Sequence, residues 1–385
     1  MTHQEWDGIS VDMGATWIHG AGPRNPIAQL AKKVGARLAI TSTEKTNTFG
    51  TNGELYNDAD MRVLEALQEE IEAAVSEAQE VDPDRSLLDA VRAEIDYLDM
   101  SISARKRVDF LINTTYEHEY GASAKELSAH WFDSGDAYSG SESLFLDGYR
   151  VLVEHLSRGL DIKLGQVVTQ IDRSGEKVVV TSGEQSYRAA QVIVTLPLGV
   201  LKSGAVTFRP ELPQEKLEAI EGLGVGVLNK CCLRFSEPFW DTEMDWINYV
   251  PEQHGRWAEW VSLARVTGAP ILMGFNAADF GREIEGWTDA QIVQDAMKTL
   301  KVMFGEAIPE PIDWVITRWA TDSFALGSYS CNVLGASPPM RGDLASSVDG
   351  KLFFAGEATD EQFYQTVHGA YASGLRAANE AIAET

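Results

Sequence analysis

The chain opens with a short alternation of apolar and polar residues, "ISVDMGATWIHG" at 9–20. Its first five residues follow the period-2 pattern of a half-buried strand. Gly14 and Gly20 then bracket a stretch where the backbone must bend and a ligand can approach closely. Only eight residues precede Ile9, too few for a supporting element. We therefore expect this strand to lack a neighbour and to expose a sheet edge.

Apolar residues at helical spacing predict four helices in the first third of the chain. They cover residues 25–35, with Gly35 as the stop signal, and residues 58–80, 86–94 and 101–117. The Gly-, Ser- and Asp-rich "DSGDAYSGSES" follows them and is typical of a crossover between domains.

The middle of the chain is rich in strands. A helix over "YRVLVEHLSRGL" leads into three or four strands within 161–197, and a second strand-rich region begins at "LGVGVLNKCCLRF". One helix interrupts that region at 288–304, where Thr288 and Gln291 have the spacing of a capping box.

The C-terminal run predicts a buried strand, "LFFAG", then a loop and a helix that begins near Val367. Small residues repeat at helical spacing along this helix, at Ala370, Gly374, Ala377 and Ala381. Such a face permits close packing against a sheet or a bound ligand.

Composition is that of a globular protein, with 44% hydrophobic and 23% charged residues, and 385 residues suffice for two domains. The formal charge of −26 argues against nucleic-acid partners and anionic membranes. It favours a cationic substrate through long-range attraction, although a merely solvated acidic surface is the commoner explanation.

Cysteine usage and hydropathy bear on location. The three cysteines, Cys231, Cys232 and Cys331, form no disulfide framework and have no metal-ligand spacing, which suits a reducing cytoplasm. The longest apolar stretch, "VIVTLPLGVL", has ten residues and is too short to span a membrane. The N-terminus does not read as a signal peptide. We expect a cytoplasmic protein without a metal or a membrane partner.

The sequence lacks the common motifs for dinucleotide binding, nucleophilic catalysis and zinc binding. "GLGVGV" at 222–227 gives G-x-G-x-G rather than G-x-G-x-x-G, and no helix is expected after it. The sequence contains neither a G-x-S-x-G nucleophile elbow nor an HExxH zinc site.

Three stretches together resemble one family, the FAD-dependent amine oxidases, in the branch of polyamine oxidases and lysine-specific histone demethylases. They are "DMGATWIHG…NPI", "VIVTLPLGVLK…LGVGVLNKCCLRFSEPFWD" and "RWATDSFALGSYS…LFFAGEATDEQFYQTVHGAYASGLRAA". The resemblance implies a mixed α/β fold with a discontinuous Rossmann-like FAD-binding domain and an inserted substrate-binding domain. The expected ranges are 1–40, 141–212 and 340–385 for the first and 41–140 and 213–339 for the second.

In this family a βαβ unit with G-x-G-x-x-G precedes the strand of "DMGATW". It places a helix N-terminus on the pyrophosphate and a carboxylate on the ribose, and about 40 such residues are missing here. Either the start is misassigned, or the unit was lost, or a separate polypeptide supplies it. We expect residues 1–385 alone to bind FAD poorly.

The helix that begins near Val367 carries the strongest physical argument for flavin binding. Free N–H groups and the positive end of the dipole at a helix N-terminus favour an anion. Reduced flavin carries negative charge at its N1/C2=O edge, which the amides of Thr366 and Val367 match. Without the resemblance, a capped helix packed on a strand would explain the same pattern.

Other cofactor residues are implied by the resemblance alone. Glu357 matches the family glutamate beside the ribityl-pyrophosphate region of FAD. Thr16 and Trp17 match backbone contacts to the flavin, and Val168 matches the valine whose backbone pairs with adenine.

Lys230 has two interpretations. On a strand it faces the same way as Cys232 and Arg234, which favours a solvent-facing lysine. Its match to the family motif "LNK" instead implies the lysine that holds a water against flavin N5. A lysine in a dry pocket would have a lowered pKa and could accept a proton.

The resemblance also places Tyr329 and His19 in the site. Tyr329 would form one wall of an aromatic cage over the flavin, and Thr366 stands where several polyamine oxidases have the opposite tyrosine. We expect Trp319 and Phe324 to pack in the core. His19 would lie near the substrate amine, with a structural, hydrogen-bonded histidine as the alternative.

The implied reaction is FAD-dependent oxidation of a small cationic amine, such as spermine or spermidine, to an imine and then an aldehyde, with O₂ reduced to H₂O₂. FAD carries the redox chemistry. The alternative is a non-catalytic or partner-dependent subunit that cannot hold FAD alone.

Overall fold

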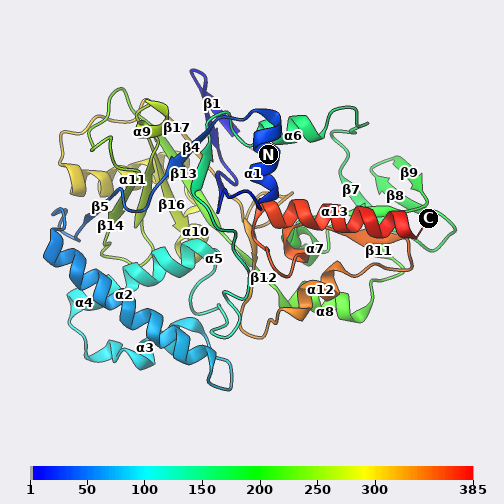
Figure 1. Ribbon diagram of the computed structural model, residues 1–385, viewed down its shortest axis with the longest axis horizontal. Coiled ribbons are helices and arrows are strands. Elements are labelled where there is room, and N and C mark those ends of the chain that lie inside the picture. Colours follow the sequence, from blue (N-terminus) through cyan, green and yellow to red (C-terminus); the bar gives the residue numbers. More distant parts are fainter. Residues whose placement is uncertain (1–2, 385) are drawn as a thin grey trace.

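A computed structural model describes residues 3–384 and shows a mixed α/β protein, as the sequence predicts. Figure 1 shows two groups of elements side by side, one around a six-stranded sheet and one around the long C-terminal helix α13 (Val367–Ala383). Both groups draw on distant parts of the sequence. The proposed division into two domains at the predicted boundaries stays a prediction.

The six-stranded sheet is the centre of the first group. It is antiparallel except for the pair of its last two strands. Helix α11 (Asp289–Phe304) covers one face and starts with the predicted capping box, so that prediction is confirmed. In spatial order the strands are β17 (Asp313–Ile316), β13 (Leu228–Arg234), β16 (Ile271–Ala277), β15 (Glu259–Ser262), β14 (Trp246–Tyr249) and β5 (Thr46–Phe49).

An N-terminal hairpin covers the other face of this sheet. β1 (His3–Trp6) pairs antiparallel with β2 (Ile9–Asp12). Asp7 and Gly8 turn the chain with φ of 52° and 84°, as a two-residue hairpin turn requires. The prediction that nothing supports the opening strand is therefore wrong, because four residues of β1 suffice to pair with it. Apolar side chains of the hairpin are buried against the sheet.

Helices cover the end of the first group, and the pattern predicted all of them except the short α5. Their apolar faces share one core with residues of the sheet region. The predicted helix at 101–117 changes into a π-helical turn at Asn113–Glu117. The helices are α2 (Asp58–Gln79), α3 (Leu87–Glu94), α4 (Ile102–Ile112) and α5 (His118–Tyr120).

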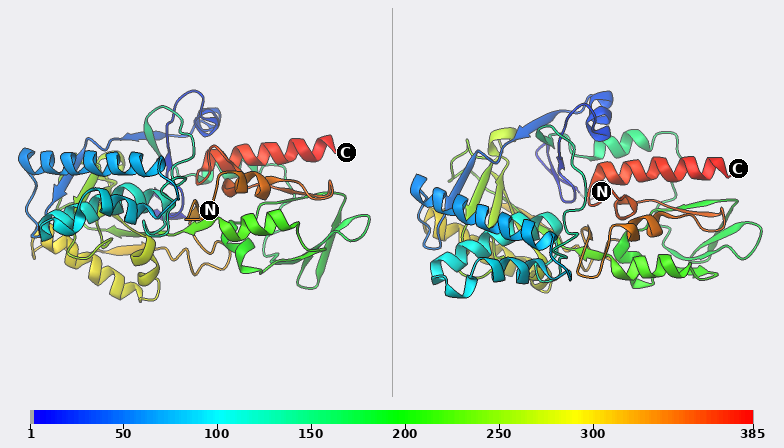
Figure 2. Two further views of the ribbon diagram at one scale, coloured as in Figure 1. Left: turned by 90° about the horizontal axis from the view of Figure 1, so that it is seen from below. Right: turned by 60° about the horizontal axis from the view of Figure 1, so that its bottom comes forward.

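The second group is built around a parallel strand pair, β10 (Val192–Val194) and β19 (Leu352–Phe354). Helix α13 packs its small residues on one side, where Phe353 and Ala377 are fully buried. Figure 2 shows α13 along this group from two further directions. Against the other side lie α7 (Leu198–Ser203), α8 (Gln214–Gly222), α12 (Pro339–Ala345) and a sheet of β11 (Thr207–Arg209), β7 (Val168–Asp172), β8 (Val178–Ser182) and β9 (Gln185–Ala189).

Smaller elements complete the two groups and the region between them. The predicted crossover at 133–143 leads into β6, which pairs with β3 on one side and with β4 on the other. α1 ends at Gly35 as predicted, with Gly35 in the left-handed conformation. These elements are β3 (Trp17–Ile18), β6 (Glu142–Phe145), β4 (Leu38–Thr41), α1 (Pro26–Val34), α6 (Arg150–Leu156), β12 (Gly224–Gly226), β18 (Tyr329–Cys331), α9 (Ala264–Thr267) and α10 (Ala278–Ile284).

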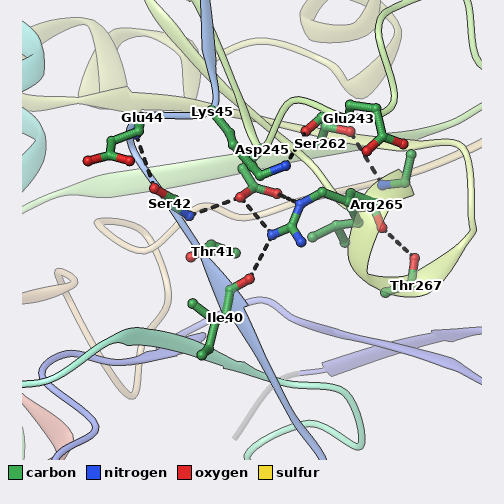
Figure 3. Close-up of polar contacts among 12 residues, drawn as sticks. Ile40, Thr41, Ser42, Glu44, Lys45, Glu243, Asp245, Ser262, Arg265 and Thr267 are labelled. Carbon is green, nitrogen blue, oxygen red and sulfur yellow. Dashed lines mark hydrogen bonds and ion pairs between the residues drawn. The ribbon is translucent and has the colours of Figure 1, made fainter.

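A buried ion pair fastens β4 to the six-stranded sheet (Figure 3). Asp245 is fully buried and accepts from Arg265 Nε at 2.6 Å and Nη2 at 2.7 Å. It also accepts from the Ser42 backbone N–H at 2.9 Å, and Arg265 donates to the Ile40 carbonyl at 2.6 Å. The carboxylate raises the pKa of Arg265 above its ordinary value.

Among residues 3–384, the structure has no helix that is both long enough and apolar enough to cross a membrane.

Candidate active site

Lys230 is buried and joins the six-stranded sheet to the glycine turn of the opening motif. Its side chain leaves β13 toward the N-terminal hairpin, and the residue is only 5% exposed. Nζ donates to the carbonyl oxygens of Asp12 at 3.0 Å and Gly14 at 2.5 Å, and to Thr16 Oγ1. The solvent-facing interpretation of Lys230 is therefore wrong.

Burial lowers the pKa of Lys230 to about 8, because an ammonium group loses its hydration there. The negative potential of Cys232 and Asp12 opposes this shift without cancelling it. A neutral amine is thus accessible close to neutral pH. Such an amine can accept a proton from a neighbouring water or substrate.

Aromatic rings line the region beside Lys230. Trp17 stacks on Trp246 with ring centroids 5.8 Å apart, and Phe275 lies 6.3 Å from Trp17. Lys230 Nζ lies 6.0 Å from the Trp17 ring centroid. Trp17 Nε1 is held by Thr41 Oγ1 at 3.0 Å. These rings give the site apolar walls.

Tyr329 lies on β18 and its hydroxyl donates to the His118 carbonyl at 2.8 Å. Burial raises its pKa well above the ordinary value, so the phenol stays neutral. The prediction of core packing is wrong for Phe324, which is 65% exposed. Trp319 is half-buried, with its ring close to Gly14.

Sequence reasoning missed His118 and Glu259. His118 Nδ1 lies 3.0 Å from Glu259 Oε2, and its ring contacts the edge of Phe275 at 6.3 Å between centroids. His118 follows directly on the π-helical turn Asn113–Glu117, a feature often found at functional sites. Periodicity does not reveal such a turn, so the sequence held no signal for this pair.

His19 lies at the surface of this region, with a side chain that is 62% exposed, and it binds Glu142 at 2.6 Å. Loss of hydration opposes the imidazolium, but the Glu142 carboxylate raises the pKa of His19 above its ordinary value. Burial and the charge of His19 lower the pKa of His368 to about 4. The hydrogen-bonded interpretation of His19 is thus compatible with the structure, and its role toward substrate stays a prediction.

Helix α13 begins at Val367 as predicted. Thr366 caps it by accepting from the Gly369 N–H at 2.9 Å, and no acidic residue lies in the first turn. Within residues 3–384, Gln365 Nε2 is buried without a hydrogen-bond partner beside this end. The unpartnered Gln365 Nε2 and the amides of the first turn fit an anionic group at the N-terminus of α13.

Glu357 links the strand of Tyr329 to the start of α13. Its carboxylate accepts from the Ser330 N–H at 3.0 Å, from Ser330 Oγ at 2.7 Å and from the Gln365 N–H at 2.6 Å. A structural role is evident from these bonds. Its contact with FAD stays a prediction.

The remaining predicted cofactor residues lie in different places. Thr16 is buried beside Lys230, and the Trp17 carbonyl accepts from Tyr149 Oη at 2.6 Å. Val168 is half-buried at the start of β7, within the four-stranded sheet of the second group. The structure therefore brings Thr16, Trp17 and Lys230 together, and Val168 belongs to another sheet.

Comparison with known proteins decides the family. The family described as "Flavin containing amine oxidoreductase" matches residues 1–382. The chain belongs to this family. It is an amine oxidase, as the sequence predicts, and its cofactor is FAD.

Individual relatives point the same way. Polyamine oxidase 2 of Arabidopsis thaliana is 33% identical over 97% of this chain and 78% of its own length. A lysine-specific histone demethylase 1 homolog 3 of Oryza sativa subsp. indica is 41% identical over 66% of this chain and 32% of its own length. A solved putrescine oxidase variant is 16% identical and covers 99% of this chain and 90% of its own, with a TM-score of 0.77, which shows the shared fold.

Proposed function

We propose that the protein oxidises a small cationic amine, a polyamine such as spermine or spermidine, with O₂ as the electron acceptor. Overall, the substrate amine, O₂ and water give an aldehyde, the released amine and H₂O₂. The buried Lys230 amine beside an aromatic wall carries this proposal. Relatives named polyamine oxidases match 97% of the chain, and these names support the substrate class.

The chain's own residues prepare an amine for hydride loss. Substrate amines are protonated at neutral pH, with a pKa near ~10. The walls formed by Trp17, Trp246 and Phe275 exclude water and so favour the neutral amine. Lys230, with its lowered pKa, holds a water or accepts a proton.

The N-terminus of α13 offers amides and a positive dipole end to a developing negative charge. When bound, FAD supplies the two-electron acceptor for the amine C–H hydride and the electron donor for O₂. The protein supplies orientation and electrostatics. We also propose a cytoplasmic location, which the three buried free cysteines suit.

The test is anaerobic reduction of the FAD-loaded protein. Spermidine should bleach the flavin absorbance band, and admission of O₂ should restore it with release of one H₂O₂ per flavin. The polyol sorbitol, which has no amine, serves as the control. A flavin that no amine reduces would contradict the proposal and favour a non-catalytic subunit.

The charge of −26 gives a second expected result. If the acidic surface attracts polycations, kcat/KM for spermine should fall as NaCl rises from 20 to 300 mM, because salt screens long-range attraction. The fall should be steeper than for a monoamine. Equal salt slopes for both substrates would show that the charge serves solubility only.

A further inference from the structure

Asn229 lies next to Lys230 on β13, and its side chain points to the opposite face of the sheet, because side chains alternate along a strand. On that face it is buried, with 1% exposure. Its Nδ2 donates to the Gly281 carbonyl at 3.0 Å and to Glu285 Oε1 at 2.7 Å. Both N–H donors of the amide are thus used, and they fasten β13 to the end of α10.

The acceptor atom of the same amide holds the segment that follows β17. Asn229 Oδ1 accepts from Thr317 Oγ1 at 2.9 Å and from the Trp319 N–H at 3.1 Å. Thr317 Oγ1 in turn accepts from the Lys230 N–H at 2.8 Å, and the Thr317 N–H donates to the Lys230 carbonyl at 3.0 Å. One partner of Asn229 is therefore bonded directly to the backbone of Lys230.

Glu285 secures the same segment a few residues further on. It directly follows α10 and is 8% exposed. Besides the Asn229 amide, its carboxylate accepts from the backbone N–H groups of Ala320 and Thr321, each at 2.8 Å. These donors are neutral, and a buried carboxylate is unfavourable unless it is well hydrogen-bonded. Three short bonds offset that penalty, and they fix the turn that follows Trp319.

The segment meets Lys230 a second time, through the glycine turn of the opening motif. The Trp319 ring lies close to Gly14, whose carbonyl accepts from Lys230 Nζ at 2.5 Å. A cleft of about 340 Å³ borders the segment, and Met13, Thr317 and Trp319 contribute to its lining. If the segment moved, water from this cleft would hydrate the Lys230 amine.

We propose that Asn229 and Glu285 are positioning residues for Lys230 in the amine oxidation. Acting through Thr317 and Trp319, they keep the Lys230 amine in place and away from water. This inference rests on the proposed function, because it concerns the same proton acceptor. Loosening the segment would hydrate the amine and return its pKa from about 8 toward the ordinary value of a lysine.

A direct charge effect would give the opposite result in one variant. Glu285→Gln removes a negative charge, which by itself lowers the pKa of a nearby lysine or leaves it unchanged, whereas hydration raises that pKa. Asn229→Ala changes no charge, so a shift there comes from structure. The titratable groups whose potential acts on Lys230 are Cys232 on β13 and Asp12 on the hairpin, and both remain in the two variants.

The test measures the pKa of Lys230 by NMR of the FAD-loaded protein, labelled with ¹³C at the lysine ε-carbons. The signal of Lys230 is the one that is missing in Lys230→Met. Its pKa should rise by about one unit or more in Glu285→Gln and in Asn229→Ala, because hydration removes part of the shift that burial causes.

Asp289→Asn is the matched control. It removes one carboxylate charge next to the same segment, at an exposed residue whose Oδ1 accepts from Arg318 Nη2 at 2.7 Å. Arg318 keeps its bond to the Trp287 carbonyl at 2.8 Å in this variant. The pKa of Lys230 should therefore stay at its wild-type value.

Flavin reduction by an amine gives a second readout. With a pKa one unit higher, the neutral fraction of Lys230 falls about tenfold at pH 7 and hardly at all at pH 10. The reduction rate of Glu285→Gln should therefore be about tenfold below that of the wild type at pH 7 and should approach it at pH 10.

A raised pKa of Lys230 in Glu285→Gln, absent in Asp289→Asn, supports the positioning role. An unchanged or lowered pKa in Glu285→Gln or in folded Asn229→Ala overturns it, and so does an equal rise in Asp289→Asn. If Asn229→Ala does not fold, Glu285→Gln decides. A wild-type protein whose flavin no amine reduces would contradict the proposed function, whereas the NMR titration would still decide whether Asn229 and Glu285 position Lys230.

Discussion

Lys230→Met is expected to slow flavin reduction by amine, or flavin reoxidation by O₂, by about 10²-fold or more, the usual effect of losing an acid–base group. The thioether fills similar space but neither accepts a proton nor holds a water. FAD content should change little, because the predicted contacts of this region with FAD are made by the backbone of Thr16 and Trp17 and not by the Lys230 side chain. Anaerobic and oxygen-mixing stopped-flow traces of the flavin band measure the two half-reactions separately.

Lys216→Met provides the matched control for that variant. Lys216 is equally buried, burial lowers its pKa to about 7, and Nζ donates to the carbonyls of Asp343 at 2.9 Å and Leu344 at 2.6 Å. It lies on α8 in the second group, away from Trp17. Both variants should lose stability, but only Lys230→Met should slow the flavin. Unchanged half-reactions in Lys230→Met would leave Lys230 a structural residue.

The pH dependence of flavin reduction should carry the signature of Lys230. Its pKa is lowered to about 8, so the neutral, proton-accepting form grows as pH rises through that value. The rate should therefore increase with pH toward a plateau, with one apparent pKa near 8. In Lys230→Met the rate should no longer increase with pH through this value. A rise caused by the substrate amine would shift with the pKa of the substrate, whereas the rise caused by Lys230 would stay near pH 8. A rise near pH 8 that persists in Lys230→Met contradicts the assignment.

Elements with local signals could be predicted from the sequence. The helix 289–304 begins where Thr288 and Gln291 cap each other, and α13 begins one residue after Thr366, whose side chain satisfies an N–H of the first turn. These bonds lie within a few residues of one another. A short stretch of the sequence therefore contains all the residues that determine where these two helices begin.

Orientation on the central sheet could not be predicted in the same way. Both faces of β13 are covered, one by α11 and the other by the N-terminal hairpin, so alternation alone did not tell where Lys230 points. The hairpin itself was missed because a four-residue strand gives almost no periodic signal. Phe324 was wrongly expected in the core because aromatic residues are often buried, whereas this one is exposed.

The distant pair of His118 and Glu259 lay beyond sequence reasoning. Its partners are 141 residues apart, and His118 follows directly on the π-helical turn Asn113–Glu117. The resemblance to the amine oxidases supplied Lys230 and Tyr329 through their motifs. It supplied neither His118 nor Glu259, whose contact only the folded chain brings about.

Asp245→Ala is expected to lower the free energy of unfolding by about 2 kcal/mol or more, because the fully buried carboxylate accepts two charged bonds from Arg265 and one from the Ser42 N–H, while the freed Arg265, 25% exposed, regains only water. Arg265 would keep its bond to the Ile40 carbonyl but lose both bonds to the carboxylate, and the Ser42 N–H would lose its acceptor (Figure 3). The midpoint of a urea unfolding curve measures the loss.

The exposed pair of Lys301 and Glu310, with Nζ and Oε1 2.8 Å apart, is the comparison that isolates burial. Glu310 is 69% exposed, so Glu310→Ala should change stability by less than about 1 kcal/mol. Replacing both Asp245 and Arg265 by alanine should cost less than the sum of the single changes, because the double variant leaves no unpaired buried charge. Additive losses, or equal effects of Asp245→Ala and Glu310→Ala, would show that the Asp245 pair does not fasten β4 to the sheet.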